Sequence, residues 1–174
     1  VTDATWNALA ARYDEHHLMD AVETFNQFTV LSMIYNSFGV QPDAETTDRL
    51  PTDVPYRITV PDRERPLSIA RFDPLDGPAI AVSRTFARYP ALAQPRSRRA
   101  NYINRVAPLS PRDREMLILR IGWNCQAVYE WARHVGRAPD LDPMLVAQGP
   151  EGSRASAFDV TLLRVVDDLY QNAI

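Results

Sequence analysis

Glu130 and His134 stand four residues apart, and a second glutamate, Glu115, precedes them in the chain. Residues four positions apart on a helix share a face, so these two side chains can meet. Two carboxylates and an imidazole on packed helices can transfer protons. The alternative is an exposed ion pair that contributes about 0.3–0.5 kcal/mol. The neighbouring Tyr129 and Trp131 favour a partly buried setting instead.

Glu115 interrupts an otherwise apolar stretch that continues through residues 116–119. Its carboxylate could be a second proton carrier, cap the helix, face solvent, or pair with Arg112 or Arg120. Arg120 in turn could bind a substrate carboxylate through two parallel hydrogen bonds, or it could be the structural partner of Glu115. The sequence leaves these alternatives open.

Other polar residues are weaker candidates for chemistry. Cys125 is the only cysteine, so no intrachain disulfide forms. A nearby helix N-terminus would stabilise its thiolate, but a lone cysteine is more often a small buried hydrophobe, which we favour. The adjacent His16 and His17 point in different directions on a helix, and we expect no metal site. Arg96, with its neighbours, is expected to lie on a solvated helix face.

Composition indicates a single soluble globular domain. The chain has 174 residues, of which 45% are hydrophobic and 24% charged. A net charge of −3 argues against a nucleic-acid partner. The absence of lysine excludes a Schiff-base mechanism. No apolar run approaches the roughly 20 residues of a membrane span, and polar residues interrupt any signal-peptide core, so we expect no membrane partner and a cytoplasmic location.

Helical spacing of apolar residues predicts an all-α fold. A short first helix is capped by Thr2 or Asp3, and a long helix from about Asp14 to Phe38 ends at Gly39. Helical character resumes at Pro78, and a turn is expected at Pro90. Further helices are expected over Gln94–Val106, Pro111–Gly122 and Gln126–Gly136, in a short turn at Met144–Ala147, and from Ala157 onward.

Two local signals refine this prediction. Ser110 followed by Pro111 is a strong helix start, and the weak helix formers of Gly122–Cys125 predict a break. Tyr56–Val60 is the only candidate strand.

Proline is dense between residues 41 and 77, where it excludes long helices and central strands. We therefore divide the chain into a helical segment at 1–40, a proline-rich arm at 41–77 and a helical core at 78–174, which together form one domain. An extended connection of this length is unusual inside a compact domain. It predicts an arm that wraps the domain or a neighbouring subunit.

The segments Leu109–Glu115, Ile118–Arg120 and Tyr129–His134 resemble the carboxymuconolactone decarboxylase family, which also contains alkyl hydroperoxidase D. Trp6–Ala10 and Leu18–Asp20 resemble a segment that follows this motif in many relatives. The resemblance thus covers residues 78–174 and then 1–40, in rotated order. This order resembles a circular permutation, natural or engineered, or a piece of a tandem repeat. It predicts that Val1 and Ile174 lie close together.

The family resemblance implies an alkyl hydroperoxidase D-like helical bundle that assembles into a homo-oligomer, either a dimer, a trimer or a hexamer. It also implies a site at the start of the motif helix. In the hydroperoxidase branch, two cysteines precede the histidine, and an upstream glutamate accepts a proton. Here Ala127 and Glu130 occupy the cysteine positions, while Glu115 matches the glutamate. Disulfide exchange needs two thiols, so thiol peroxidase activity is not expected.

The resemblance therefore implies a cofactor-free, decarboxylase-like lyase for a small carboxylated or lactone-like substrate. His134 would be the general acid or base, Glu130 would orient it or share its proton, and Glu115 would be the second proton carrier. The residues expected to contact substrate are Arg120, Tyr129 and Trp131.

Two alternatives remain. The first is a non-catalytic oligomeric protein that binds a ligand or acts as a scaffold, having lost the redox cysteine pair. The second, less favoured, is residual peroxidase activity through Cys125.

Overall fold

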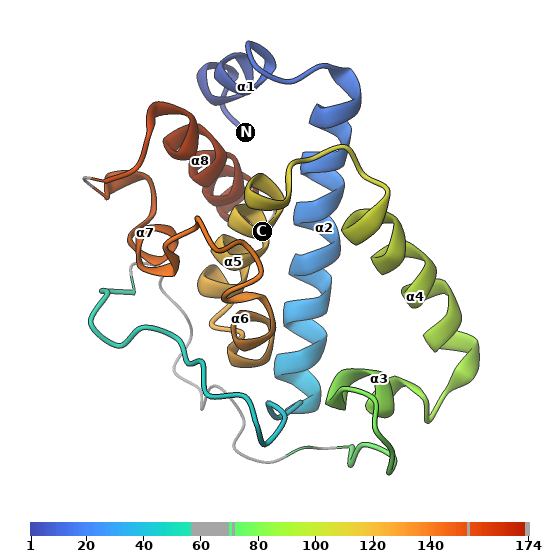
Figure 1. Ribbon diagram of the computed structural model, residues 1–174. Coiled ribbons are helices and arrows are strands. Elements are labelled where there is room, and N and C mark those ends of the chain that lie inside the picture. Colours follow the sequence, from blue (N-terminus) through green and yellow to red (C-terminus); the bar gives the residue numbers. More distant parts are fainter. Residues whose placement is uncertain (57–69, 71, 153, 173–174) are drawn as a thin grey trace.

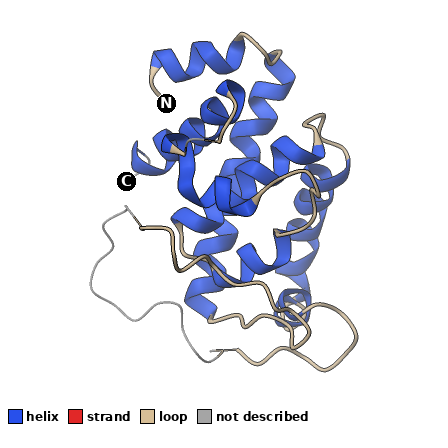
Figure 2. Ribbon diagram, turned by 60° about the vertical axis from the view of Figure 1, so that its left-hand side comes forward, coloured by secondary structure: helices blue, strands red, loops and turns tan. Residues whose placement is uncertain are grey.

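The computed structural model describes residues 1–56, 70, 72–152 and 154–172. These residues form eight α-helices and one short 3-10 helix, with no strand among them (Figures 1 and 2). The helices are α1 (Asp3–Ala10), α2 (Glu15–Phe38), α3 (Ala81–Phe86), α4 (Pro90–Arg105), α5 (Pro111–Asn124), α6 (Val128–His134), α7 (Pro143–Gln148), η1 (Gly149–Glu151) and α8 (Ala157–Asn172). The predicted all-α class is confirmed. None of the described helices is long and apolar enough to cross a membrane.

The long helix α2 lies against α5 and α6 in the middle of the molecule, with α4 on its other side (Figure 1). Its start is capped by Asp14, whose carboxylate accepts a hydrogen bond from the N–H of His17. Its end is set by Gly39, which has φ 62°, a left-handed conformation that glycine adopts without strain. Both bounds agree with the prediction.

The helix α5 is the most deeply buried element and packs against α2, α6, α7 and α8. Ser110 caps it by accepting a hydrogen bond from the N–H of Asp113, with Pro111 in its first turn, as predicted. It continues through Gly122 to Asn124, two residues beyond the predicted end. The break falls at the next residues instead, where Gln126 has φ 50°.

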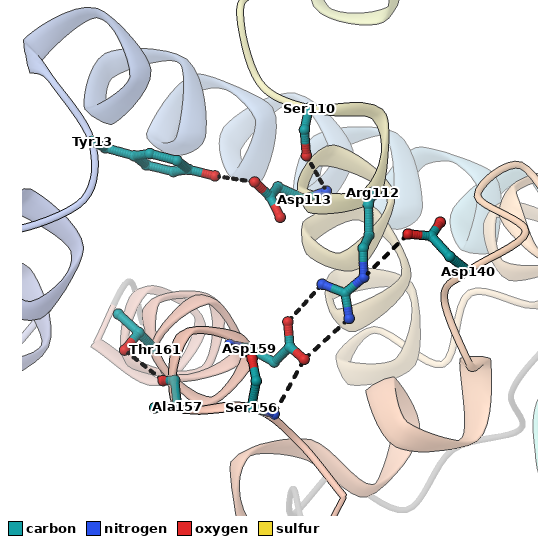
Figure 3. Close-up of polar contacts among 9 residues, drawn as sticks. All are labelled: Tyr13, Ser110, Arg112, Asp113, Asp140, Ser156, Ala157, Asp159 and Thr161. Atoms are coloured by element: carbon teal, nitrogen blue, oxygen red, sulfur yellow. Dashed lines mark hydrogen bonds and ion pairs between the residues drawn. The ribbon is translucent and has the colours of Figure 1, made fainter.

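Side chains at the start of α5 connect it to three distant segments (Figure 3). The Tyr13 hydroxyl donates to Asp113 at 2.8 Å. Arg112 donates two hydrogen bonds to Asp159 of α8, at 2.6 and 3.1 Å, and lies 3.7 Å from Asp140. Arg112 is therefore a partner of Asp159, so the alternative that it pairs with Glu115 is wrong.

The region between α3 and α5 differs in detail from the prediction. A turn separates α3 from α4, but α4 begins at Pro90 itself and not at Gln94. Proline suits the first helical position because the N–H that it lacks would have no partner inside the helix. The expected helical turn at Met144–Ala147 is present as α7, which is capped by Asp142.

The described parts of the proline-rich arm contain neither helix nor strand. Val54 is buried in the core, and the Tyr56 hydroxyl donates to the carbonyl of Asn124 while its ring packs edge-on against Trp123. The arm thus returns to the domain at the end of α5. The predicted strand Tyr56–Val60 lies outside the described residues except for Tyr56, and contact with a neighbouring subunit stays a prediction.

The first residues of the chain lie beside α8. The N–H of Thr2 donates to Asp168 at 3.2 Å, and α1 packs on α8 (Figure 1). The prediction that Val1 and Ile174 are close involves Ile174, which lies outside the described residues.

Arg120 connects α5 to α8 and α7. Its guanidinium donates to both carboxylate oxygens of Asp167 at 2.8 Å, and also to the carbonyls of Val146 and Ala147. A Cβ added at Gly149 would lie only 2.5 Å from the guanidinium, so the glycine there makes room for it. Four of its N–H groups bind the protein itself, which makes Arg120 a structural residue of the core.

Replacing Arg120 should therefore destabilise the fold strongly. In Arg120→Met, Asp167 keeps a charge in a mostly buried position without its partner, and we expect the free energy of unfolding to fall by about 3–5 kcal/mol. Chemical denaturation would measure it. The exposed Arg164→Met on α8 is the control and should change stability by less than about 0.5 kcal/mol. Equal effects of the two variants would contradict this assignment.

Candidate functional site

The side chains of Glu115, His134 and Glu130 form a continuous buried cluster, called the Glu-His-Glu cluster below. His134 Nδ1 lies 2.6 Å from Glu115 Oε2, and His134 Nε2 lies 2.9 Å from Glu130 Oε1. The three residues are 2%, 4% and 3% exposed, in the same order. The alternative of an exposed Glu130–His134 pair is wrong, and Glu115 pairs with the imidazole rather than with Arg120.

The packing of three helices produces this arrangement. Glu130 and His134 occupy successive turns of α6, so they share a face. Glu115 comes from α5, which crosses α6 closely enough that a Cβ at Gly122 would lie 3.7 Å from the backbone of Trp131. Phe28 of α2 places its ring edge-on to the imidazole, with centroids 5.1 Å apart. The ring of His134 is thereby held between an apolar contact and two carboxylates.

The electrostatics of the cluster favour the protonated imidazole. Burial lowers the pKa of His134, but the hydrogen bonds to Glu115 and Glu130 and the charges of these carboxylates outweigh burial and raise it above its ordinary value. As an imidazolium, His134 donates from both ring nitrogens, one to each carboxylate. A proton can therefore be shared along the path Glu115–His134–Glu130.

A cavity of about 250 Å³ opens beside the cluster and is bordered by residues of α2, α3, α4 and α6. Glu130 and His134 line it, together with apolar side chains that include Phe28 and Leu31. Glu115 is not among the lining residues, so it lies behind the imidazole. A small molecule in this cavity would meet one carboxylate and one imidazole.

Of the three residues expected to contact substrate, the structure brings only Tyr129 to the cavity. Its hydroxyl accepts a hydrogen bond from the N–H of Val82 at 3.1 Å, and its ring packs edge-on against Tyr35. Trp131 is a core residue, 1% exposed and packed near Trp123. Arg120 does not line the cavity and is hydrogen-bonded to Asp167 instead. Its position therefore does not support the expected role in substrate binding.

Three arginines that the sequence did not indicate as site residues line the cavity: Arg96, Arg133 and Arg137. Arg96 was expected on a solvated face, but it is half-buried and donates to the hydroxyl of Tyr35 at 2.6 Å. Arg133 and Arg137 follow Glu130 at helical spacing, which is a signal that could have placed them on the same side as His134.

The remaining candidates lie apart from the cavity. Cys125 is at the C-terminal end of α5, and burial raises the pKa of its thiol to about 12 in spite of hydrogen bonds with Tyr170 and Ser32. This opposes formation of a thiolate. His17 bonds to Asp14 at the start of α2. Within the part of the chain that the structure describes, no three histidine, cysteine or acidic side chains are grouped so as to hold a metal ion.

Comparison with known proteins found no family model, no curated protein and no solved structure that matches this chain. The resemblance to the carboxymuconolactone decarboxylase family stays a prediction.

Proposed function

We propose that this protein is an enzyme that uses the Glu-His-Glu cluster to transfer a proton to or from a small molecule in the adjoining cavity. One observation carries the proposal: an imidazole is hydrogen-bonded through both nitrogens to buried carboxylates, and one edge of this cluster lines a cavity. General acid–base catalysis by such groups contributes about 10²- to 10⁴-fold to a rate.

The position of each residue suggests its role. Glu130 and His134 line the cavity, so either can exchange a proton with a bound molecule. Glu115 lies behind and holds the proton on Nδ1, which keeps His134 oriented and stabilises its imidazolium form. The raised pKa of His134 makes the imidazolium available as a general acid near neutral pH.

The reaction that we favour is a cofactor-free decarboxylation, as the family resemblance implies. The bond between the carboxylate carbon and its neighbour breaks, carbon dioxide leaves, and the electron pair stays on the substrate carbon. A proton from His134, passed directly or through Glu130, then forms the new C–H bond. Solvent restores the proton to the neutral imidazole, so one proton is consumed for each carbon dioxide released.

The alternative of a non-catalytic ligand-binding protein is supported less well. A binding cavity does not require two buried carboxylates and an imidazole beside it, and burying such groups costs desolvation free energy even when they are paired. In this chain the cavity and the cluster adjoin. That combination favours an enzyme over a scaffold.

The first test is the role of His134. His134→Gln should lower the loss of γ-carboxymuconolactone and the release of carbon dioxide by about 10²- to 10⁴-fold, because the amide supplies no transferable proton. The matched control is His16→Gln, since the His16 side chain is 68% exposed. Circular dichroism would verify that both variants fold. Turnover retained in His134→Gln would contradict the role proposed for it, and no turnover by the unaltered protein would contradict the lactone as substrate.

The second test concerns the pKa of His134 and needs no substrate. In Glu115→Gln, one hydrogen-bonded carboxylate charge is lost while burial stays, so the pKa of His134 should fall. Its imidazolium should then be lost at lower pH, and the basic limb of any pH–rate profile should move the same way. Titration of the ring nitrogens by nuclear magnetic resonance would measure this, with the exposed Glu45→Gln as control. An unchanged titration in Glu115→Gln would contradict the coupling.

A further inference from the structure

The cavity has a basic wall in addition to the Glu-His-Glu cluster. Arg133 precedes His134 on α6 and lines the cavity, yet it forms no ion pair with any carboxylate of the described residues. Its Nε is buried and has no hydrogen-bond partner among those residues. Arg137 lines the cavity from an exposed position beyond α6. A guanidinium without a carboxylate partner, such as that of Arg133, has N–H groups that can donate to a ligand.

A second pair, Arg96 and Tyr35, completes this wall. Arg96 Nη2 donates to the Tyr35 hydroxyl at 2.6 Å, and the guanidinium lies over the ring of Phe86, 4.5 Å from its centroid. Because the tyrosine oxygen accepts from Arg96, its own hydrogen points elsewhere, and no acceptor for it is found among the described residues. Burial and the nearby charge of Glu130 raise the pKa of Tyr35, so the hydroxyl keeps its proton and remains a donor.

The charges of the cavity indicate an anionic ligand. Two carboxylates and one imidazolium in the cluster carry one net negative charge, and Arg114, whose Nε lies 3.8 Å from Glu115 Oε1, offsets it. The wall holds three further guanidinium groups. Partly buried cations without a counter-charge are costly, and a bound anion would offset that cost. Arginine also suits carboxylates, since its planar fork can donate two parallel hydrogen bonds.

The size and apolar lining of the cavity limit what the rest of the ligand can be. Its volume of about 250 Å³ is below the common range for drug-sized ligands. Phe28 and Leu31 provide an apolar surface beside the cluster, and Tyr129 faces Tyr35 edge-on. Such a lining fits one small ring.

We propose that Arg133, together with the Arg96–Tyr35 pair, binds the carboxylate of a small cyclic acid and places its ring beside Glu130 and His134. Binding of the substrate carboxylate, which the sequence suggested for Arg120, is thus assigned to Arg133. This inference rests on the proposed function in that it takes the cavity to be the substrate site, but it concerns binding and can be tested without turnover.

The experiment is calorimetric titration of the unaltered protein with benzoate, a carboxylate on one small ring, and with benzamide, its neutral analogue. Benzoate should bind and benzamide should bind at least tenfold more weakly. Arg133→Gln should weaken benzoate binding by about tenfold or more, because a hydrogen bond to a charged partner is lost. The control is Arg98→Gln, an exposed arginine of α4 outside the cavity that gives the same change in net charge.

A second variant guards against an effect of folding. Tyr35→Phe keeps the ring and removes only the hydroxyl, and it should weaken benzoate binding by several-fold without changing the circular dichroism spectrum. Three results would overturn the proposal: no binding of benzoate, equal binding of benzoate and benzamide, or equal affinities of Arg133→Gln and Arg98→Gln. Binding of inorganic phosphate as tight as that of benzoate would overturn the assignment to a cyclic acid.

Failure of this inference can be distinguished from failure of the proposed function. Benzoate binding that depends on Arg133, combined with unchanged turnover in His134→Gln, would contradict only the proposed function. Loss of turnover in His134→Gln, combined with benzoate binding that does not depend on Arg133, would contradict only this inference.

Discussion

The buried imidazole of His134, bonded to one carboxylate on each side, is the interaction on which the site depends. Burying Glu115 or Glu130 alone would leave an uncompensated charge, which is strongly unfavourable. The three groups are tolerated in the interior because each hydrogen bond has a charged partner. This requirement sets how closely α5 and α6 must cross. The imidazole also lines the cavity.

Two partly buried ion pairs of α5 have a structural role instead. Arg120 with Asp167 and Arg112 with Asp159 both connect α5 to α8, and neither arginine lines the cavity beside His134. Both use two parallel hydrogen bonds to a carboxylate, a geometry that lysine could not provide. These pairs hold the last helix against the central one. Arg133 differs from them because it has no such carboxylate among the residues that the structure describes.

The cavity therefore presents two chemically distinct sets of side chains. Glu130 and His134 can accept or donate a proton, and the guanidinium groups attract negative charge. Glu130 and His134 are shielded from water, and electrostatic interactions are stronger away from water. A molecule with one carboxylate and a reactive carbon a few bonds away would meet both at once. Binding and proton transfer would then depend on different residues.

The sequence by itself determined the local interactions of this protein. Ser110 and Pro111 predicted the start of α5, Gly39 predicted the end of α2, and the four-residue spacing predicted the contact of Glu130 with His134. Each of these depends on residues within one helical turn, so the neighbouring sequence contains all the information.

Only the tertiary structure decided the partners that are distant in sequence. The sequence left Glu115 with several possible partners, and the structure pairs it with His134, 19 residues away. It likewise pairs Arg120 with Asp167, 47 residues away. Arg96, expected on a solvated helix face, lines the cavity. The physical reason is that such contacts depend on how the helices cross, which results from packing of the whole core and not from any single segment.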